Sequence, residues 1–157
     1  MYYGEYHIAI DEKGRFSVPV SLRALMEAQG HETWFMTRGF DGAVFLFTNA
    51  MWEKLVEQGA GTPLDPRRLD FRRLFVGSMG KSRLDRQGRL FVPTHLRAYA
   101  GVEREGVLIG VGDHFELWNE QGWLAFQERQ AQEYKRMAAE LFGARPERAT
   151  EPEGNGQ

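Results

Sequence analysis

Cysteine is absent from the 157 residues. This absence excludes a disulfide scaffold, a cysteine-ligated zinc site and a thiol nucleophile, and it is compatible with a reducing cytosol. Long apolar runs are lacking as well, since no stretch approaches the roughly 18 residues that span a bilayer. The first fifteen residues lack the basic start and apolar core of a secretory signal. We therefore expect a cytoplasmic protein that makes no membrane contact.

A basic excess is also missing. The chain has 20 Lys and Arg residues against 22 Asp and Glu, and its net charge is -2. Free duplex-binding proteins often carry a basic excess, so this balance counts slightly against nucleic acid. The charge is uneven, however, because five basic residues and a single acid, Asp85, lie between Lys81 and Arg97. Any contact with nucleic acid is therefore expected in local loops.

The chain contains one motif twice. Residues 11–23 read DEKGRFSVPVSLR and residues 85–97 read DRQGRLFVPTHLR, with seven identities at a constant offset of 74. Each copy is followed by a short helical pattern ending in glycine, then by strand-like runs around a glycine-containing turn, and then by a polar residue and a tryptophan. The sequence thus predicts two copies of one unit: strand, tight turn, strand, short helix, hairpin, helix.

This repeat organises the chain into four parts. We expect a first repeat at 1–58, a linker helix within 59–80, a second repeat at 81–143, and a disordered tail at 144–157. Asp65 before Pro66 predicts the start of the linker helix. The second repeat is expected to end in a longer helix with an apolar stripe, which serves as core or subunit interface together with Trp52. The stripe consists of Trp123, Phe126, Tyr134, Met137 and Leu141.

The turn of the motif carries the functional hypothesis. Apolar and polar residues alternate on both sides of Asp-Glu-Lys-Gly, which indicates a hairpin. Gly14 and Gly88 can adopt positive φ, and the Asp11 and Asp85 carboxylates can accept hydrogen bonds from backbone N–H groups two or three residues on. For one such segment alone, the simplest interpretation is a turn with a capping arginine.

Recurrence favours a binding role for the turn. An arginine directly follows the glycine in both copies, and further basic residues lie in or beside each turn. A guanidinium group can contact guanine O6 and N7, or phosphate oxygens, with two parallel hydrogen bonds. The candidate DNA-binding residues are Lys13, Arg15, Lys81, Arg83, Arg86 and Arg89, and the candidate loop-shaping residues are Asp11, Gly14, Asp85 and Gly88.

The doubled Asp-x-x-Gly-Arg-(apolar)₂-Val-Pro motif resembles the MraZ family, over about residues 1–143. The resemblance implies an α+β, β-rich fold of two tandem AbrB-like swapped-hairpin barrel repeats. It also implies a transcriptional regulator of the bacterial division and cell-wall gene cluster, including its own promoter. Such a regulator binds G-rich direct repeats of double-stranded DNA at the nucleoid and assembles with itself into rings. The family's paired Asp and Arg residues correspond to Asp11 with Arg15 and to Asp85 with Arg89.

Two alternatives from other classes remain open: an antitoxin-like module and a purely structural assembly protein. Catalysis, cofactors and small-molecule ligands are not expected. The GSMGKS segment at 77–82 lacks the first glycine of a phosphate-binding loop and precedes a turn and strand pattern rather than a helix. The four histidines are scattered without metal-ligand spacing.

Overall fold

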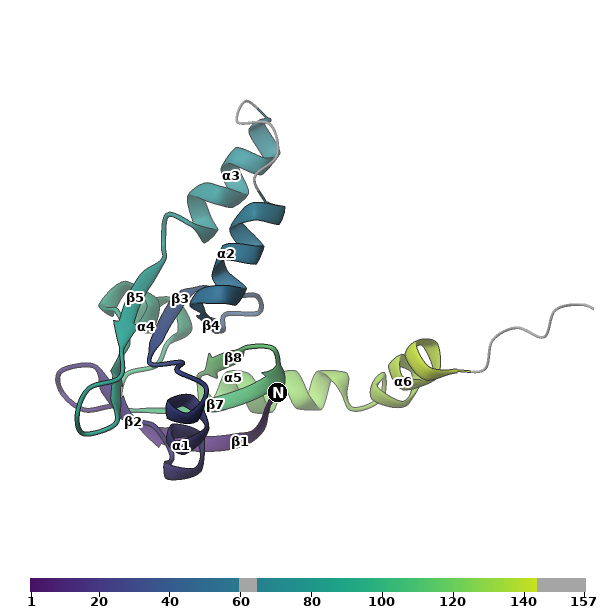
Figure 1. Ribbon diagram of the computed structural model, residues 1–157. Coiled ribbons are helices and arrows are strands. Elements are labelled where there is room, and N and C mark those ends of the chain that lie inside the picture. The colour runs from purple at the N-terminus through teal and green to yellow at the C-terminus, as the bar shows by residue number, and fades with distance from the viewer. Residues whose placement is uncertain (60–64, 144–157) are drawn as a thin grey trace, which may run out of the picture. The chain divides into compact units, whose positions relative to one another are not determined.

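The computed structural model describes residues 1–59 and 65–143. The chain divides into two compact units, of which the first ends at Trp123 and the second begins at Leu124. The predicted tail at 144–157 and part of the linker lie outside the described residues. The first repeat consists of β1 (Tyr2–Ala9), β2 (Arg15–Ser17), α1 (Val20–Ala28), β3 (Thr33–Arg38), β4 (Val44–Thr48) and α2 (Asn49–Gln58). After α3 (Pro66–Phe75), the second consists of β5 (Gly80–Arg83), β6 (Arg89–Phe91), α4 (Thr94–Ala100), β7 (Glu105–Gly112), β8 (Phe115–Trp118) and α5 (Glu120–Gln130), before α6 (Tyr134–Phe142) (Figure 1).

The two repeats follow the predicted order of elements and exchange strands with each other. The main sheet has the order β1-β7-β8-β4-β3-β5, which reads the same from either end when equivalent strands of the two repeats are interchanged. The first strand of each repeat pairs with the third of the other, β1 with β7 and β5 with β3, all antiparallel. The fold is therefore α+β with two tandem repeats whose first strands are swapped.

The strands of the described residues differ from the predicted barrels. They form one shared six-stranded sheet and a separate two-stranded sheet of β2 and β6. The larger sheet does not close into a barrel. The three-residue strands β2 and β6 pair with each other, so β1 and β5 are left as the edges of the larger sheet. The expected local hairpin is likewise reduced to a single bridge, Ile10↔Phe16, after which the two strands diverge to their separate partners.

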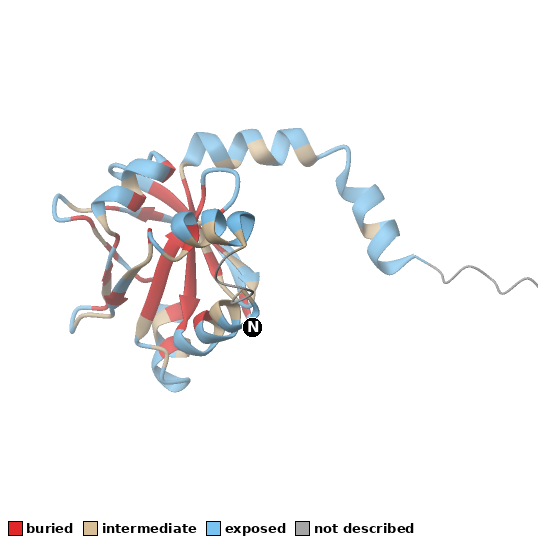
Figure 2. Ribbon diagram, turned by 90° about the horizontal axis from the view of Figure 1, so that it is seen from above, coloured by how far each residue is buried: buried red, intermediate tan, exposed pale blue. Residues whose placement is uncertain are grey.

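Alternation along the strands divides the buried side chains between the two faces of the sheet. Trp34 and Met36 of β3 point to the face that carries the main core. Phe16 and Leu90 of the two-stranded sheet belong to the same core, which thereby anchors β2 and β6. The buried residues, red in Figure 2, lie mainly on the strands. A smaller cluster covers the opposite face with side chains from β3, β4, α2 and α3: Phe35, Phe45, Phe47, Trp52 and Phe75.

Two of the helices, α2 and α3, begin with a side-chain cap. The Asp65 carboxylate accepts a hydrogen bond from the Arg67 N–H at 3.1 Å, and Pro66 occupies the first position of α3, as predicted. Thr48 caps α2 by accepting a hydrogen bond from the Met51 N–H at 3.3 Å. Both caps satisfy N–H groups that have no partner within the helix.

The second repeat ends in a longer helix than the first, as predicted, since α5 has 11 residues and α2 has 10, but this helix does not carry the whole apolar stripe. The helix ends at Gln130 and a second one begins at Tyr134; the intervening Ala-Gln-Glu holds no glycine or proline that would explain the break. The expected apolar stripe is therefore divided between α5 and α6. Tyr134 and Leu141 are 74% and 78% exposed, so they are not core residues, whereas Trp52 is buried as predicted.

Candidate nucleic-acid interface

Two equivalent turns carry the candidate residues: turn 1 is residues 11–15 and turn 2 is residues 85–89. In turn 1, Asp11 Oδ1 accepts hydrogen bonds from the N–H groups of Lys13 (2.9 Å) and Arg15 (3.0 Å). Asp11 Oδ2 accepts one from Arg15 Nε at 2.9 Å. The Gly14 N–H donates to the Asp11 carbonyl at 3.0 Å, which closes the turn. The aspartate thus reaches two and four residues ahead.

Turn 2 has the same geometry. Asp85 Oδ1 accepts hydrogen bonds from the N–H groups of Gln87 and Arg89, both at 2.9 Å, and Oδ2 accepts one from Arg89 Nε at 2.8 Å. The Gly88 N–H donates to the Asp85 carbonyl at 3.0 Å. The three residue types that the turns share, Asp, Gly and Arg, therefore build the same loop twice with different residues at the other two positions.

The same contacts lower the pKa of both aspartates. The largest cause is the hydrogen bond from the backbone N–H of Arg15 or Arg89, which holds the carboxyl pKa below its ordinary value. Partial desolvation opposes this shift, and the arginine side chain adds to it. Both carboxylates therefore remain charged at neutral pH and keep the arginines aligned.

Arg15 and Arg89 lie on one outward face of the two-stranded sheet. The register pairs Arg15 with Phe91 and Arg89 with Ser17, around a central pair whose side chains are buried. Diagonal neighbours on one face of such a ladder are about 7–8 Å apart. The two arginine side chains are 28% and 25% exposed. Nε donates to the aspartate, and no other hydrogen bond or ion pair within residues 1–59 and 65–143 uses the guanidinium, so its terminal nitrogens keep their donors for a ligand.

The two turns are also joined to each other. The Val18 N–H donates to the Gly88 carbonyl and the Val92 N–H donates to the Gly14 carbonyl, both at 2.9 Å. These bonds place the two turns side by side, at one edge of the unit formed by residues 1–123 (Figure 1). Lys13 and Arg86 are exposed at their tips.

Arg23 and Arg97 extend this site and were not among the predicted residues. The guanidinium of Arg97 lies on Gly14, and that of Arg23 lies on Gly88. Both glycines have positive φ, +83° and +75°, so the turn and the close approach each require glycine. The repeat held the signal for these arginines, because they are the last identical position of the thirteen.

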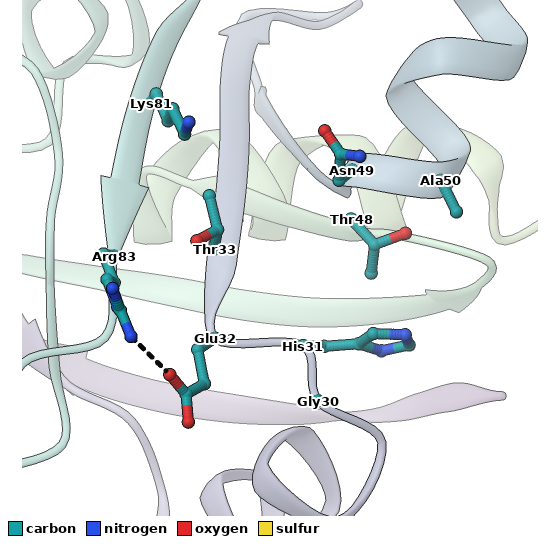
Figure 3. A pocket seen from close by; sticks show the side chains of 9 residues that line it. All are labelled: Gly30, His31, Glu32, Thr33, Thr48, Asn49, Ala50, Lys81 and Arg83. Carbon is teal, nitrogen blue, oxygen red and sulfur yellow. Dashed lines mark hydrogen bonds and ion pairs between the residues drawn. The ribbon is translucent and has the colours of Figure 1, made fainter.

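Two of the predicted residues lie apart from the turns. Arg83 is exposed and forms an ion pair with Glu32 at 3.1 Å (Figure 3). Lys81 pairs with Phe35 in the β5–β3 register, and its ammonium lies 5.8 Å from the centre of that ring, on the sheet face opposite the main core. The structure therefore brings Lys13, Arg15, Arg86 and Arg89 together, and it leaves Lys81 on the other face.

The structure also describes the segments considered for a phosphate-binding loop and a metal site. The end of GSMGKS enters strand β5 rather than a helix, and Ser78 accepts a hydrogen bond from the Arg38 N–H and donates one to the Leu74 carbonyl. Within the described parts of the chain, no three histidine or acidic side chains are grouped to hold a metal ion. The helices of those parts include none that is long and apolar enough to cross a membrane.

Comparison with known proteins identifies the family. The model of the MraZ protein family, which is described as antitoxin-like, matches residues 1–68 and 78–144, and these two ranges correspond to the two repeats. The chain belongs to the MraZ family. A relative from Heliobacterium modesticaldum is 38% identical over 90% of this chain and 97% of its own length, and it is named transcriptional regulator MraZ.

Other relatives carry the same name. One from Thermomicrobium roseum is 36% identical over 90% of this chain and 97% of its own length. One from Lactiplantibacillus plantarum is 35% identical over 90% of this chain and 99% of its own length. These MraZ relatives are named as regulators of transcription and not as enzymes.

Proposed function

We propose that this protein is a cytoplasmic, nucleoid-associated transcriptional regulator that binds double-stranded DNA through turns 1 and 2. The observation that carries the proposal is the pair of side-by-side turns, each presenting an arginine that an aspartate holds in place. The name shared by its MraZ relatives supports the regulatory role.

The two-stranded form of the site suits the major groove. The groove is about 12 Å wide and admits a two-stranded β-ribbon, and β2 with β6 is such a ribbon. Arg15 and Arg89 stand on its outer face, where their terminal nitrogens can fork onto guanine O6 and N7. Lys13 and Arg86, at the tips of the turns, supply phosphate contacts, which position a protein without reading sequence.

Self-assembly compensates for the unfavourable effect of the net charge on DNA affinity. A single subunit with this few free cations binds DNA weakly at physiological salt. Several subunits in a ring, each on one of the G-rich direct repeats that the family resemblance implies, raise affinity by about 10²–10⁴. Exposed apolar side chains on α6 offer a surface for assembly: Tyr134, Met137, Leu141 and Phe142. The proposed targets are the division and cell-wall gene cluster and the protein's own promoter.

The test is fluorescence anisotropy at about 150 mM salt, with about four tandem G-rich repeats and a shuffled duplex of equal length. We expect the wild type to prefer the repeats at least tenfold, about 1.4 kcal/mol. Arg15→Ala/Arg89→Ala should lose this preference while its assembly size by light scattering is unchanged.

The matched control is Lys54→Ala/Lys81→Ala, which removes the same charge from exposed residues away from the turns. This variant should keep the preference. If the control and the arginine variant lose affinity equally, the arginines act only through net charge. If the wild type does not prefer the repeats to the shuffled duplex, the protein does not read these repeats. That result would favour the structural or antitoxin-like alternative.

A further inference from the structure

We propose that Arg23 and Arg97 are positioning residues, each of which holds the DNA-reading turn of the other repeat. The inference rests on the proposed function of turns 1 and 2, and it adds that neither repeat can present its turn alone. The swapped strand order makes this possible, because it brings the end of each motif copy onto the turn of the other copy.

Arg97 and its neighbours enclose turn 1. A Cβ placed on Gly14 would lie 2.7 Å from Arg97 Cζ, so the guanidinium covers the glycine. Arg97 Nε donates to the Val92 carbonyl at 3.0 Å, and its Nη2 donates to Thr94 Oγ1 at 3.1 Å. Val92 in turn donates its N–H to the Gly14 carbonyl at 2.9 Å. Turn 1 is thus held by a backbone bond and by an arginine that is itself fixed at two points.

Arg23 holds turn 2 in the equivalent way, with fewer bonds. Its guanidinium covers Gly88, and Nη1 donates to the Gln87 carbonyl at 3.4 Å. The Val18 N–H donates to the Gly88 carbonyl. Because Arg23 bonds directly to the backbone of turn 2, whereas Arg97 bonds within its own repeat and packs on turn 1, the two contacts are related but not identical.

A held turn has a consequence for binding. A loop that already has its bound conformation loses less conformational entropy when it meets a ligand. Removing Arg97 should therefore loosen turn 1 and weaken DNA binding through Arg15, although Arg97 itself contacts no DNA. Turn 2 and Arg89 should be unaffected. Removing Arg23 should instead loosen turn 2 and weaken DNA binding through Arg89, without an effect on turn 1.

The first arm of the test is amide hydrogen exchange on the full-length protein without DNA. In Arg97→Ala, we expect faster exchange at the Lys13 and Arg15 N–H groups, which bond to Asp11, and unchanged exchange in turn 2. Arg23→Ala should reverse the pattern. Equal acceleration of both turns, or of neither, would overturn the cross-repeat assignment.

The control for this arm is Arg104→Ala. Arg104 lines the same surface hollow as Arg97, Asp11 and Glu12, and it is exposed. Its side chain makes no hydrogen bond or ion pair to the described residues, so its removal should leave exchange in both turns unchanged. This variant separates the specific hold on Gly14 from a general loss of positive charge near the turn.

The second arm is a double-mutant cycle on DNA affinity. Arg97→Ala should weaken binding about tenfold, should add little to the loss in Arg15→Ala, and should add fully to the loss in Arg89→Ala. Additivity with Arg15→Ala would overturn the proposal.

Arg97→Lys separates positioning from direct contact. Lysine keeps the positive charge but cannot reproduce the Nε and Nη2 donors on one planar group. It should therefore behave as Arg97→Ala, whereas recovery of affinity would indicate a phosphate contact and contradict the positioning role. If the wild type did not bind the repeats, the proposed function would fail, but the exchange arm would still decide whether the arginines hold the turns.

Discussion

Turns 1 and 2 have the same hydrogen bonds but differ in charge at their tips. Turn 1 reads Asp-Glu-Lys-Gly-Arg, with two acids and two bases, whereas turn 2 reads Asp-Arg-Gln-Gly-Arg, with one acid and two bases. The Asp, Gly and Arg positions build the loop, and their contacts agree within about 0.1 Å between the two turns. The two remaining positions are exposed and make no bond through their side chains within the described residues. The residues that build the five-residue loop are therefore different from those that set the charge at its tip, and the two sets can be changed independently.

The largest expected effect comes from breaking the shared construction. Gly14→Ala should lower the free energy of unfolding by about 2–4 kcal/mol: about 1–2 kcal/mol from a side chain at positive φ, and the rest from displacing Arg97 and its two hydrogen bonds. Urea denaturation measures the change.

Gly30→Ala is the matched control, because Gly30 also has positive φ, +68°, but a Cβ added there would meet no atom within 4 Å. It should cost only the backbone strain, about 1–2 kcal/mol. Equal losses in the two variants would show that the arginine adds no stability. Gly88→Ala should fall between them, since Arg23 makes one long hydrogen bond.

A smaller effect should follow from exchanging the tips. Glu12→Arg/Lys13→Gln gives turn 1 the residues of turn 2, and we expect DNA affinity to rise several-fold. The plot of log affinity against log salt should steepen by about 0.9 for each additional phosphate that the protein neutralises. Binding titrations at several salt concentrations measure both.

The reciprocal variant, Arg86→Glu/Gln87→Lys, should have the opposite effect. Combining both exchanges restores the total charge, so affinity should return close to that of the wild type. An unchanged slope in both single exchanges would show that the tips do not reach phosphates.

The smallest effect is a pH dependence common to both turns. Asp11 and Asp85 have a lowered pKa in the folded protein, so their charged forms stabilise the fold above their ordinary value of 3.8, and this contribution is lost as the pH falls through the lowered pKa. Asp11→Asn should therefore be less stable than the wild type at neutral pH, and the difference should shrink below about pH 4.

Thermal unfolding of the wild type, Asp11→Asn and Asp85→Asn between neutral and acid pH measures this dependence. The two variants should behave alike, because the turns are built alike. Glu12→Gln is the control, since the Glu12 side chain is exposed and outside the hydrogen bonds of turn 1. A stability difference that stayed constant with pH would mean that the aspartates act through shape and not through charge.

The residues that build each turn could be predicted from the sequence, whereas the positions of Lys81 and Arg97 could not. The loop-shaping residues could be predicted, because Asp11 and Asp85 act on N–H groups at most four residues away. Lys81 is near turn 2 in sequence, which predicts a place beside it, yet strand alternation puts its side chain on the face with Phe35. Arg97 escapes prediction for the converse reason: it is far from Gly14 in sequence and adjacent to it in space.

The amino-acid sequence by itself determined the repeat, the order of elements, the two turns and the start of α3, since each depends on bonds between residues a few positions apart. Only the tertiary structure decided that β1 pairs with β7, that β2 pairs with β6, and which arginine covers which glycine. The backbone N–H and C=O groups of a strand are the same for every possible partner. The choice of partner is therefore made by the side chains that both strands bury together, here around Phe16 and Leu90.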